Sequence, residues 1–194
     1  IGSDAEPPVL DINSDVRIDL TGKSRGSSVD VSASFTDAVG RQDSIFYAFD
    51  NGDGSVLKTV SATGVKLETT GSFIIPETWE DNSLHCISLW LMNDKGAMSD
   101  TKKVYVYINP DNSSAVQEAV QYNLSYASGG ATGTSPSSVS IFEKNKVTMP
   151  VNPYTVPSGK KFGGWSDGTG VYLAGELYTM PSHNVTMTAT WIDV

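Results

Sequence analysis

The stretch HCISLWLMN (residues 85–93) decides the fold of the first half of this chain. Its apolar residues Ile87, Leu89 and Leu91 occupy every second position. A period of two is typical of a β-strand that buries one of its faces in a core. Trp90 falls out of phase with these three residues, so we predict that its ring faces away from that core.

The same alternation recurs on both sides of this stretch, in short runs broken by glycine, asparagine, aspartate and proline. Helical periodicity is nearly absent, so the pattern predicts an all-β chain. The segments that carry the alternation are 17–20, 28–35, 44–49, 56–60, 71–76, 85–93 and 102–108. About seven strands within roughly 100 residues, separated by polar turns, favour an immunoglobulin-like β-sandwich over residues 1–109.

Behind the last of these strands the sequence becomes polar (NPDNSSAVQEAVQ). We interpret residues 110–121 as a linker between two domains, with one short helix near Ala115 to Val120. A second alternating pattern follows, and it predicts a smaller all-β domain over residues 122–194.

Charge and cysteine content exclude several classes of partner. The chain has 13 basic and 22 acidic residues, for a net charge of −9. Nucleic acids and anionic membranes attract basic surfaces, so we expect neither as a partner. No apolar run reaches the length of a membrane-spanning helix, and we therefore expect no membrane insertion. Cys86 is the sole cysteine, which rules out a disulfide within the chain and predicts an apolar role in a strand.

Four motifs follow one another in the second half of the chain: YNLSYASGGATGTSP, KVTMP, GKKFGGWSDGTGVY and HNVTMTATW. Together they resemble the Listeria–Bacteroides repeat, also called the internalin B-repeat, over residues 122–194. The resemblance implies a small β-grasp-like domain that serves as a building block of secreted and cell-surface proteins, without catalysis. Lys161 departs from the family, which usually has an aromatic residue at this position.

The glycine-rich motif KKFGGWSDGTG combines a tryptophan with a preceding phenylalanine. We predict that Phe162 and Trp165 pack in the core together with Trp191, because a small domain without disulfides needs large apolar groups. Gly163 and Gly164 would let the backbone turn tightly beside Trp165. The alternative is that these rings form a platform for a carbohydrate.

The first half resembles the immunoglobulin-like and cadherin-like β-sandwiches of microbial surface proteins. The resemblance lies in the segments PPVLDI, DVSASFTD, FYAFDNGDG and LHCISLWLMNDKGAMSD. The cysteine–tryptophan–cysteine set of antibody domains is missing. Both resemblances imply an extracellular fragment of a larger microbial cell-surface protein. Its expected role is adhesion, protein interaction or spacing, and its expected partner is a protein or glycan of a host or neighbouring cell, or another domain of the same chain.

Catalytic and metal-binding patterns are largely absent, so we expect neither an enzyme nor a resident metal or cofactor. No nucleophile elbow, zinc-protease motif or phosphate-binding loop occurs. We assign His85 a structural role in its strand and His183 a place in a solvated turn. Glu77, Glu80 and Asp81 share one turn, whereas the two carboxylates of a glycosidase flank a cleft.

Acidic turns leave calcium binding open as an alternative to ordinary turn chemistry. The turn DNGDG lacks the spacing of an EF-hand loop, so we favour plain turns. The acidic and amide residues concerned are Asp4, Glu6, Asp37, Asp43, Asp50, Asp53, Asn93, Asp94 and Asp100.

Four aromatic residues of the first domain are candidates for binding a partner: Trp79, Trp90, Tyr105 and Tyr107. Trp79 is either an exposed contact or a plug beneath the sandwich. Trp90 is either a partner contact or covered by a neighbouring segment. If the four rings lay exposed in a row they could stack on sugars, which gives an alternative function as the carbohydrate-binding accessory module of a secreted hydrolase.

Overall fold

The computed structural model describes residues 9–10, 17–36, 42–61 and 67–194. These residues form β-strands joined by turns, with one short 3-10 helix, η1 (Pro110–Asn112). The chain therefore has the all-β fold that its alternating pattern predicts. It divides into two compact units, Ile1–Glu118 and Ala119–Val194, which we call unit 1 and unit 2. Among the described residues, no helix has the length and apolar character needed to cross a membrane.

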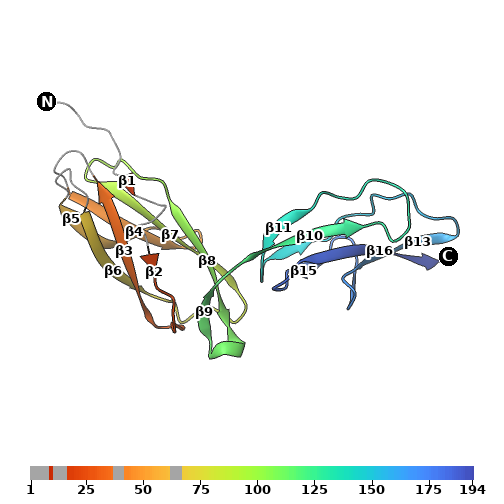
Figure 1. The fold of residues 1–194 in the computed structure, drawn as a ribbon, viewed down its shortest axis with the longest axis horizontal. Coiled ribbons are helices and arrows are strands. Elements are labelled where there is room, and N and C mark those ends of the chain that lie inside the picture. The colour runs from red at the N-terminus through yellow and green to blue at the C-terminus, as the bar shows by residue number, and fades with distance from the viewer. Residues whose placement is uncertain (1–8, 11–16, 37–41, 62–66) are drawn as a thin grey trace. The chain divides into compact units, whose positions relative to one another are not determined.

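Unit 1 is built from two antiparallel sheets (Figure 1). In the first sheet β3 lies in the centre, with β6 along one edge and with β1 and β2 along the other. The second sheet has the order β5-β4-β7-β8-β9. The strands are β1 (Val9–Leu10), β2 (Arg17–Ile18), β3 (Ser28–Thr36), β4 (Gln42–Phe49), β5 (Ser55–Ser61), β6 (Leu67–Ile74), β7 (Leu84–Asn93), β8 (Lys102–Asn109) and β9 (Ala115–Glu118).

The core of unit 1 lies between the two sheets because every second residue of each strand points inward. The central strand β7 contributes Ile87, Leu89 and Leu91, all fully buried, as their spacing predicts. Val106 and Ile108 of the neighbouring strand β8 are fully buried in the same cluster. The opposite sheet supplies the remaining wall, formed by Val29, Val31, Ala33, Phe35 and Phe73.

Trp79 closes one end of this core from the loop between β6 and β7. Its ring is buried and packs edge-on against Phe49, with centroids 5.3 Å apart. Arg25 holds the loop, since its Nη1 donates to the Trp79 carbonyl at 3.0 Å and its Nη2 pairs with Asp81 at 2.9 Å. Trp79 is thus the plug beneath the sandwich, and its assignment as an exposed binding residue is wrong.

Part of the segment expected to be a linker belongs to unit 1. β9 pairs with β8 along the sheet edge, with Val116 opposite Ile108, and the Val116 side chain is buried in the core. The short helix expected near Ala115 to Val120 is therefore wrong, because pairing with β8 and burial of a β-branched side chain favour a strand there. The division between the units falls directly after Glu118.

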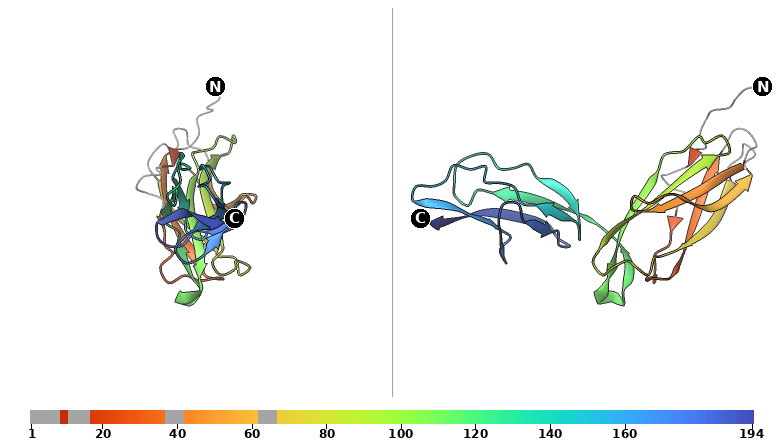
Figure 2. Two further views of the ribbon diagram at one scale, coloured as in Figure 1. Left: turned by 90° about the vertical axis from the view of Figure 1, so that its right-hand side faces the viewer. Right: turned by 180° about the vertical axis from the view of Figure 1, so that it is seen from behind.

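Unit 2 contains a five-stranded mixed sheet and a two-stranded sheet (Figures 1 and 2). The five strands have the order β11-β10-β16-β13-β14. β10 and β16, near the two ends of the unit's sequence, are parallel neighbours, which agrees with a β-grasp-like sheet. The strands are β10 (Gln121–Ala127), β11 (Val139–Phe142), β12 (Lys146–Thr148), β13 (Lys160–Ser166), β14 (Val171–Tyr172), β15 (Leu177–Thr179) and β16 (Val185–Asp193).

The motif KKFGGWSDGTG forms β13 and the turn after it. Trp165 is fully buried, and its Nε1 donates to the Pro150 carbonyl at 2.8 Å. Phe162 packs edge-on against both Trp165 and Trp191, at centroid distances of 5.5 and 5.7 Å. The pairing register with β16 shifts between Phe162 and Gly164, so the strand bulges there and both rings reach the same face. The prediction is confirmed for Trp165, which lies in the core, whereas Phe162 and Trp191 are partly buried and pack against that core.

Candidate recognition surface

The outward face of the five-stranded sheet of unit 1 carries a pair of stacked aromatic rings. Phe46 and Trp90 lie opposite each other on β4 and β7, with ring centroids 5.7 Å apart and planes 12° from parallel. The β4–β5 turn supports the indole from a second direction, since a Cβ at Gly54 would overlap the Trp90 ring. Trp90 therefore faces away from the core, as predicted, and its ring is held in place before any partner arrives.

Further apolar side chains extend this pair into a contiguous surface. Val56 lies opposite Phe46 on β5 and is 55% exposed. Met92 follows Trp90 on the same face of β7, and a β-bridge joins it to Met98, which is 50% exposed. We call Phe46, Val56, Trp90, Met92 and Met98 the outward patch.

Of the residues in this patch, only Trp90 is among the binding candidates predicted from the sequence. The signal for a second member is present, because Phe46 is out of phase with Ile45 and Tyr47 in the same way as Trp90 is in its own strand. Two out-of-phase aromatic residues on neighbouring strands indicate an apolar outer face. Their register across the sheet, which brings the two rings together, is not readable from the sequence.

Of the other predicted binding residues, neither tyrosine joins the patch. Tyr107 is buried, with 4% of its surface exposed, so its assignment as a binding ring is wrong. Tyr105 lies opposite Cys86 and shares the outward face. However, Cys86 is four residues from Trp90 along β7, which separates the two aromatic rows by about 13 Å. The four candidates therefore form no continuous row of exposed rings.

A chain of short polar contacts joins Asp50, His85 and Ser83 at the end of unit 1. His85 Nδ1 is 2.9 Å from Asp50 Oδ2, and His85 Nε2 is 2.7 Å from the Ser83 hydroxyl. This is the connectivity of a serine-hydrolase triad. The Ser83 hydroxyl, however, is also 2.6 Å from the Glu80 carbonyl, and the Ser83 N–H donates to that same carbonyl. The hydroxyl and the backbone N–H of Ser83 are thus both hydrogen-bonded within the loop. This arrangement favours a structural role for Asp50, His85 and Ser83.

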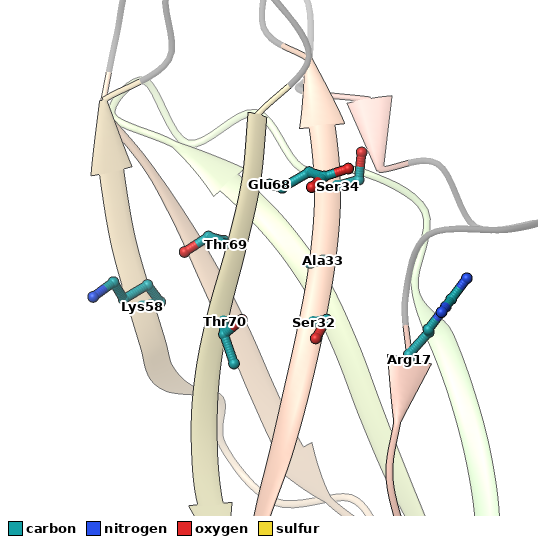
Figure 3. A pocket seen from close by; sticks show the side chains of 8 residues that line it. All are labelled: Arg17, Ser32, Ala33, Ser34, Lys58, Glu68, Thr69 and Thr70. Carbon is teal, nitrogen blue, oxygen red and sulfur yellow. The ribbon is translucent and has the colours of Figure 1, made fainter.

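A shallow hollow of about 590 Å³ lies on the outer face of the other sheet of unit 1 (Figure 3). Hydroxyl side chains dominate its floor, and Arg17 and Lys58 stand at opposite sides of it. Glu68 lies directly across from Ser34, whose buried hydroxyl has no hydrogen-bond partner among the described residues. Arg17 and Lys58 are separated from each other, and the hollow also contains the Glu68 carboxylate. Positive charge is therefore not concentrated at one point, and the described residues of the hollow do not form an anion site.

In two of the turns, side-chain oxygens of the calcium candidates accept backbone hydrogen bonds. Asp50 Oδ1 accepts from the Cys86 N–H at 2.9 Å, and Asn93 Oδ1 accepts from the N–H groups of Lys95 and Ala97 at 3.0 Å. In the part of the chain that is described, no group of three or more His, Cys, Asp or Glu residues is arranged to hold a metal ion. Three residues raised as calcium candidates, Asp4, Glu6 and Asp37, lie outside the described residues.

In unit 2 the turn after β13 is organised by one carboxylate. Asp167 Oδ1 accepts from the N–H groups of Thr169 and Gly170 at 2.8 Å, and Oδ2 lies 3.3 Å from the Tyr178 hydroxyl. Burial acts to raise the pKa of Asp167, but the hydrogen bonds from Gly170 and Thr169 outweigh it and lower that pKa overall. Burial first, and then the charge of Asp167, raise the pKa of Tyr178 to about 12.

We expect Asp167→Asn to move the ionisation of Tyr178 to lower pH, because the substitution removes the charge that opposes a tyrosinate. The contribution of Asp167 to stability is present above its ordinary pKa of 3.8 and is lost as the pH falls through its lowered folded-state pKa. In Asp167→Asn, the free energy of unfolding of unit 2 should therefore decrease less on acidification than in the parent chain. Ring-carbon NMR of the tyrosines against pH measures the first effect, and acid unfolding measures the second. Asp193→Asn is the matched control, since Asp193 pairs with Lys160 instead. Equal tyrosine titrations in the two variants would refute the coupling.

No family model matches this chain, and no curated protein matches it either.

Proposed function

We propose that the chain is a non-catalytic recognition fragment of an extracellular, cell-surface protein, and that unit 1 binds a partner protein through the outward patch. The observation that supports this function is the patch itself. Val56 and Met98 are half exposed beside the stacked Phe46–Trp90 pair, on a face with no described covering strand. Contiguous exposed apolar surface is typical of protein–protein contacts, in which tryptophan and methionine are enriched.

Unit 2 serves in this proposal as a presenting or spacing module. Its largest aromatic rings face inward, and Trp165 is fully buried. The outward side chains of its central strand β16 are mainly threonines, namely Thr186, Thr188 and Thr190, which give a polar face. The motifs that resemble the B-repeat therefore support an architectural role for this unit.

A carbohydrate-binding accessory module is the weaker reading. Stacking on a polysaccharide needs several rings exposed along one line, whereas Trp79 and Tyr107 are buried and Tyr105 lies about 13 Å along the strand from Trp90. A single half-buried indole that already stacks on Phe46 offers one sugar contact at most.

We expect Val56→Asp to weaken saturable binding of the labelled full chain to cultured mammalian epithelial cells by at least about tenfold, because a carboxylate would enter an apolar contact without a partner. Val56 is exposed on an edge strand, so the substitution should leave unfolding nearly unchanged. Binding isotherms and denaturant unfolding curves of the same samples measure the two effects.

Val171→Asp is the matched control, since Val171 is 54% exposed on the short strand β14 of unit 2. It should bind like the parent chain. Equal losses in both variants would contradict the location of the surface. Binding to a polysaccharide panel rather than to cells would favour the accessory-module function, and no binding by a folded chain would leave only a spacer.

A further inference from the structure

The net charge of this chain belongs entirely to unit 1, the unit that carries the outward patch. Of the 22 acidic and 13 basic residues of the chain, unit 2 holds four of each, which leaves 18 acidic and 9 basic residues in unit 1. Unit 2 is therefore neutral, and the net charge of −9 is that of unit 1 alone. Such a charge attracts cationic surfaces and repels anionic ones over about 10 Å at 0.1 M salt.

Acidic residues also border the outward patch at close range, in the two turns that adjoin it. Asp53 directly precedes Gly54, the residue of the β4–β5 turn that lies against the Trp90 ring. Asp94 lies in the turn after β7, two residues beyond Met92. The patch therefore has a carboxylate near each of these two members.

A third carboxylate is placed beside the patch by hydrogen bonds to β7. The Ser99 N–H donates to the Leu91 carbonyl, and the Ser99 hydroxyl accepts from the Leu91 N–H, both at 2.9 Å. Asp100 follows Ser99 and so lies beside the part of β7 that carries Trp90. We call Asp53, Asp94 and Asp100 the acidic rim, and all three are exposed.

The cations nearest to the acidic rim neutralise little of its charge. Lys95 lies 3.9 Å from Asp94, and its side chain is 67% exposed. Lys103 lies opposite Ser88 on the outward face, outside the patch. An exposed ion pair at such a distance contributes little, so the carboxylates of the rim remain open to a cationic partner.

We propose that the partner of the outward patch is a basic protein surface, in which lysine or arginine side chains surround an apolar centre. This inference rests on the proposed function, namely that unit 1 binds a protein through this patch. The apolar centre of the partner covers Phe46, Val56 and Trp90, and its cations face the acidic rim. Protein interfaces commonly combine an apolar core with a polar border, and arginine is enriched in them.

The rim and the centre of such a surface act on different rate constants. Complementary charge accelerates the encounter of two proteins by about 10-fold to 10³-fold, and salt suppresses this acceleration. Loss of an apolar contact at the centre instead acts mainly on dissociation. The charge of the partner can therefore be tested separately from the location of the patch.

The test is the salt dependence of association between the labelled full chain and membranes prepared from the same mammalian epithelial cells. Raising the salt from about 0.1 M to about 1 M shortens the Debye length from about 10 Å to about 3 Å. The association rate constant should then fall at least about tenfold. An unchanged rate constant would indicate a neutral partner, and a rate constant that rises with salt would indicate an acidic one. Either result would overturn the proposal.

The same experiment separates this inference from the function on which it rests. Saturable binding that Val56→Asp weakens, but that does not depend on salt, would retain the outward patch and overturn the basic partner. Absence of saturable binding at both salt concentrations, by a chain whose unfolding curve shows that it is folded, would overturn both.

A charge-neutral variant tests the acidic rim itself. Replacement of its three aspartates by asparagine should lower the association rate constant at about 0.1 M salt by about threefold or more, and should change the dissociation rate constant by less than about twofold. A matched control removes as many charges from exposed residues elsewhere on unit 1: Asp30→Asn, Glu68→Gln and Asp111→Asn. The control should lower the association rate constant less than the rim variant does. Equal losses in the two variants would overturn the assignment of the rim as the surface that faces the partner's cations.

Discussion

Trp165→Ala is expected to unfold unit 2 at ordinary temperature or to bring it close to that point. Trp165 is fully buried, packs against Phe162 and Tyr126, and donates a hydrogen bond to the Pro150 carbonyl. Truncation of a buried tryptophan costs about 3–5 kcal/mol. A small unit without a disulfide has little more than this to lose.

The loss is best measured by hydrogen exchange of the full chain, because that reports β13 and β16 of unit 2 separately from the strands of unit 1. Protection should collapse in unit 2 and persist in unit 1. Val171→Ala is the control, since that side chain is 54% exposed on β14. A loss of less than about 1 kcal/mol for Trp165→Ala would contradict the assignment of this ring as the centre of the core.

Gly129→Ala is expected to destabilise unit 2 nearly as much, for a reason that lies in the backbone. Gly129 has φ of +60°, and a Cβ there would overlap the carbonyl oxygen of Ala189. The neighbouring Ser128 carbonyl accepts a hydrogen bond from Trp191 Nε1 at 3.0 Å, so the chain cannot shift without disturbing that contact. Strain and overlap together should cost about 2–5 kcal/mol.

Gly130→Ala provides the matched control for this substitution. Gly130 also has a positive φ, of +93°, but nothing lies within 4 Å of a Cβ built on it. It should therefore show the backbone strain alone, of about 1–2 kcal/mol. Denaturant midpoints of unit 2 measure both variants. Equal costs at the two positions would contradict the close approach of this turn to β16.

Much of the fold could be predicted because alternation of apolar residues is a local property. The period of two in β7 and β8 gives both the strands and their inward faces. The strands that were missed are short or lack alternation. β14 and β15 have two or three residues each, β11 has four, and β9 lies in a polar segment where pairing with β8 decides the conformation.

The candidate site was less accessible to sequence reasoning, for two physical reasons. Whether a loop tryptophan turns inward depends on distant contacts, such as the hold of Arg25 on the carbonyl of Trp79, 54 residues along the chain. Whether two outward aromatics meet depends on strand register, as for Phe46 and Trp90. The chain of short polar contacts through His85 also depends on the fold, since Asp50 is 35 residues away from His85 in the sequence.

The most direct test of the proposed function is oxidative footprinting of the full chain, free and bound to the same epithelial cells. Met98 is 50% exposed in the outward patch, whereas Leu177 is 60% exposed in unit 2 and lies outside it. The proposal predicts that binding protects Met98 and Met92 from oxidation and leaves Leu177 unchanged. Protection of Leu177 with full oxidation of Met98 in the bound chain would contradict the proposal and would assign recognition to unit 2.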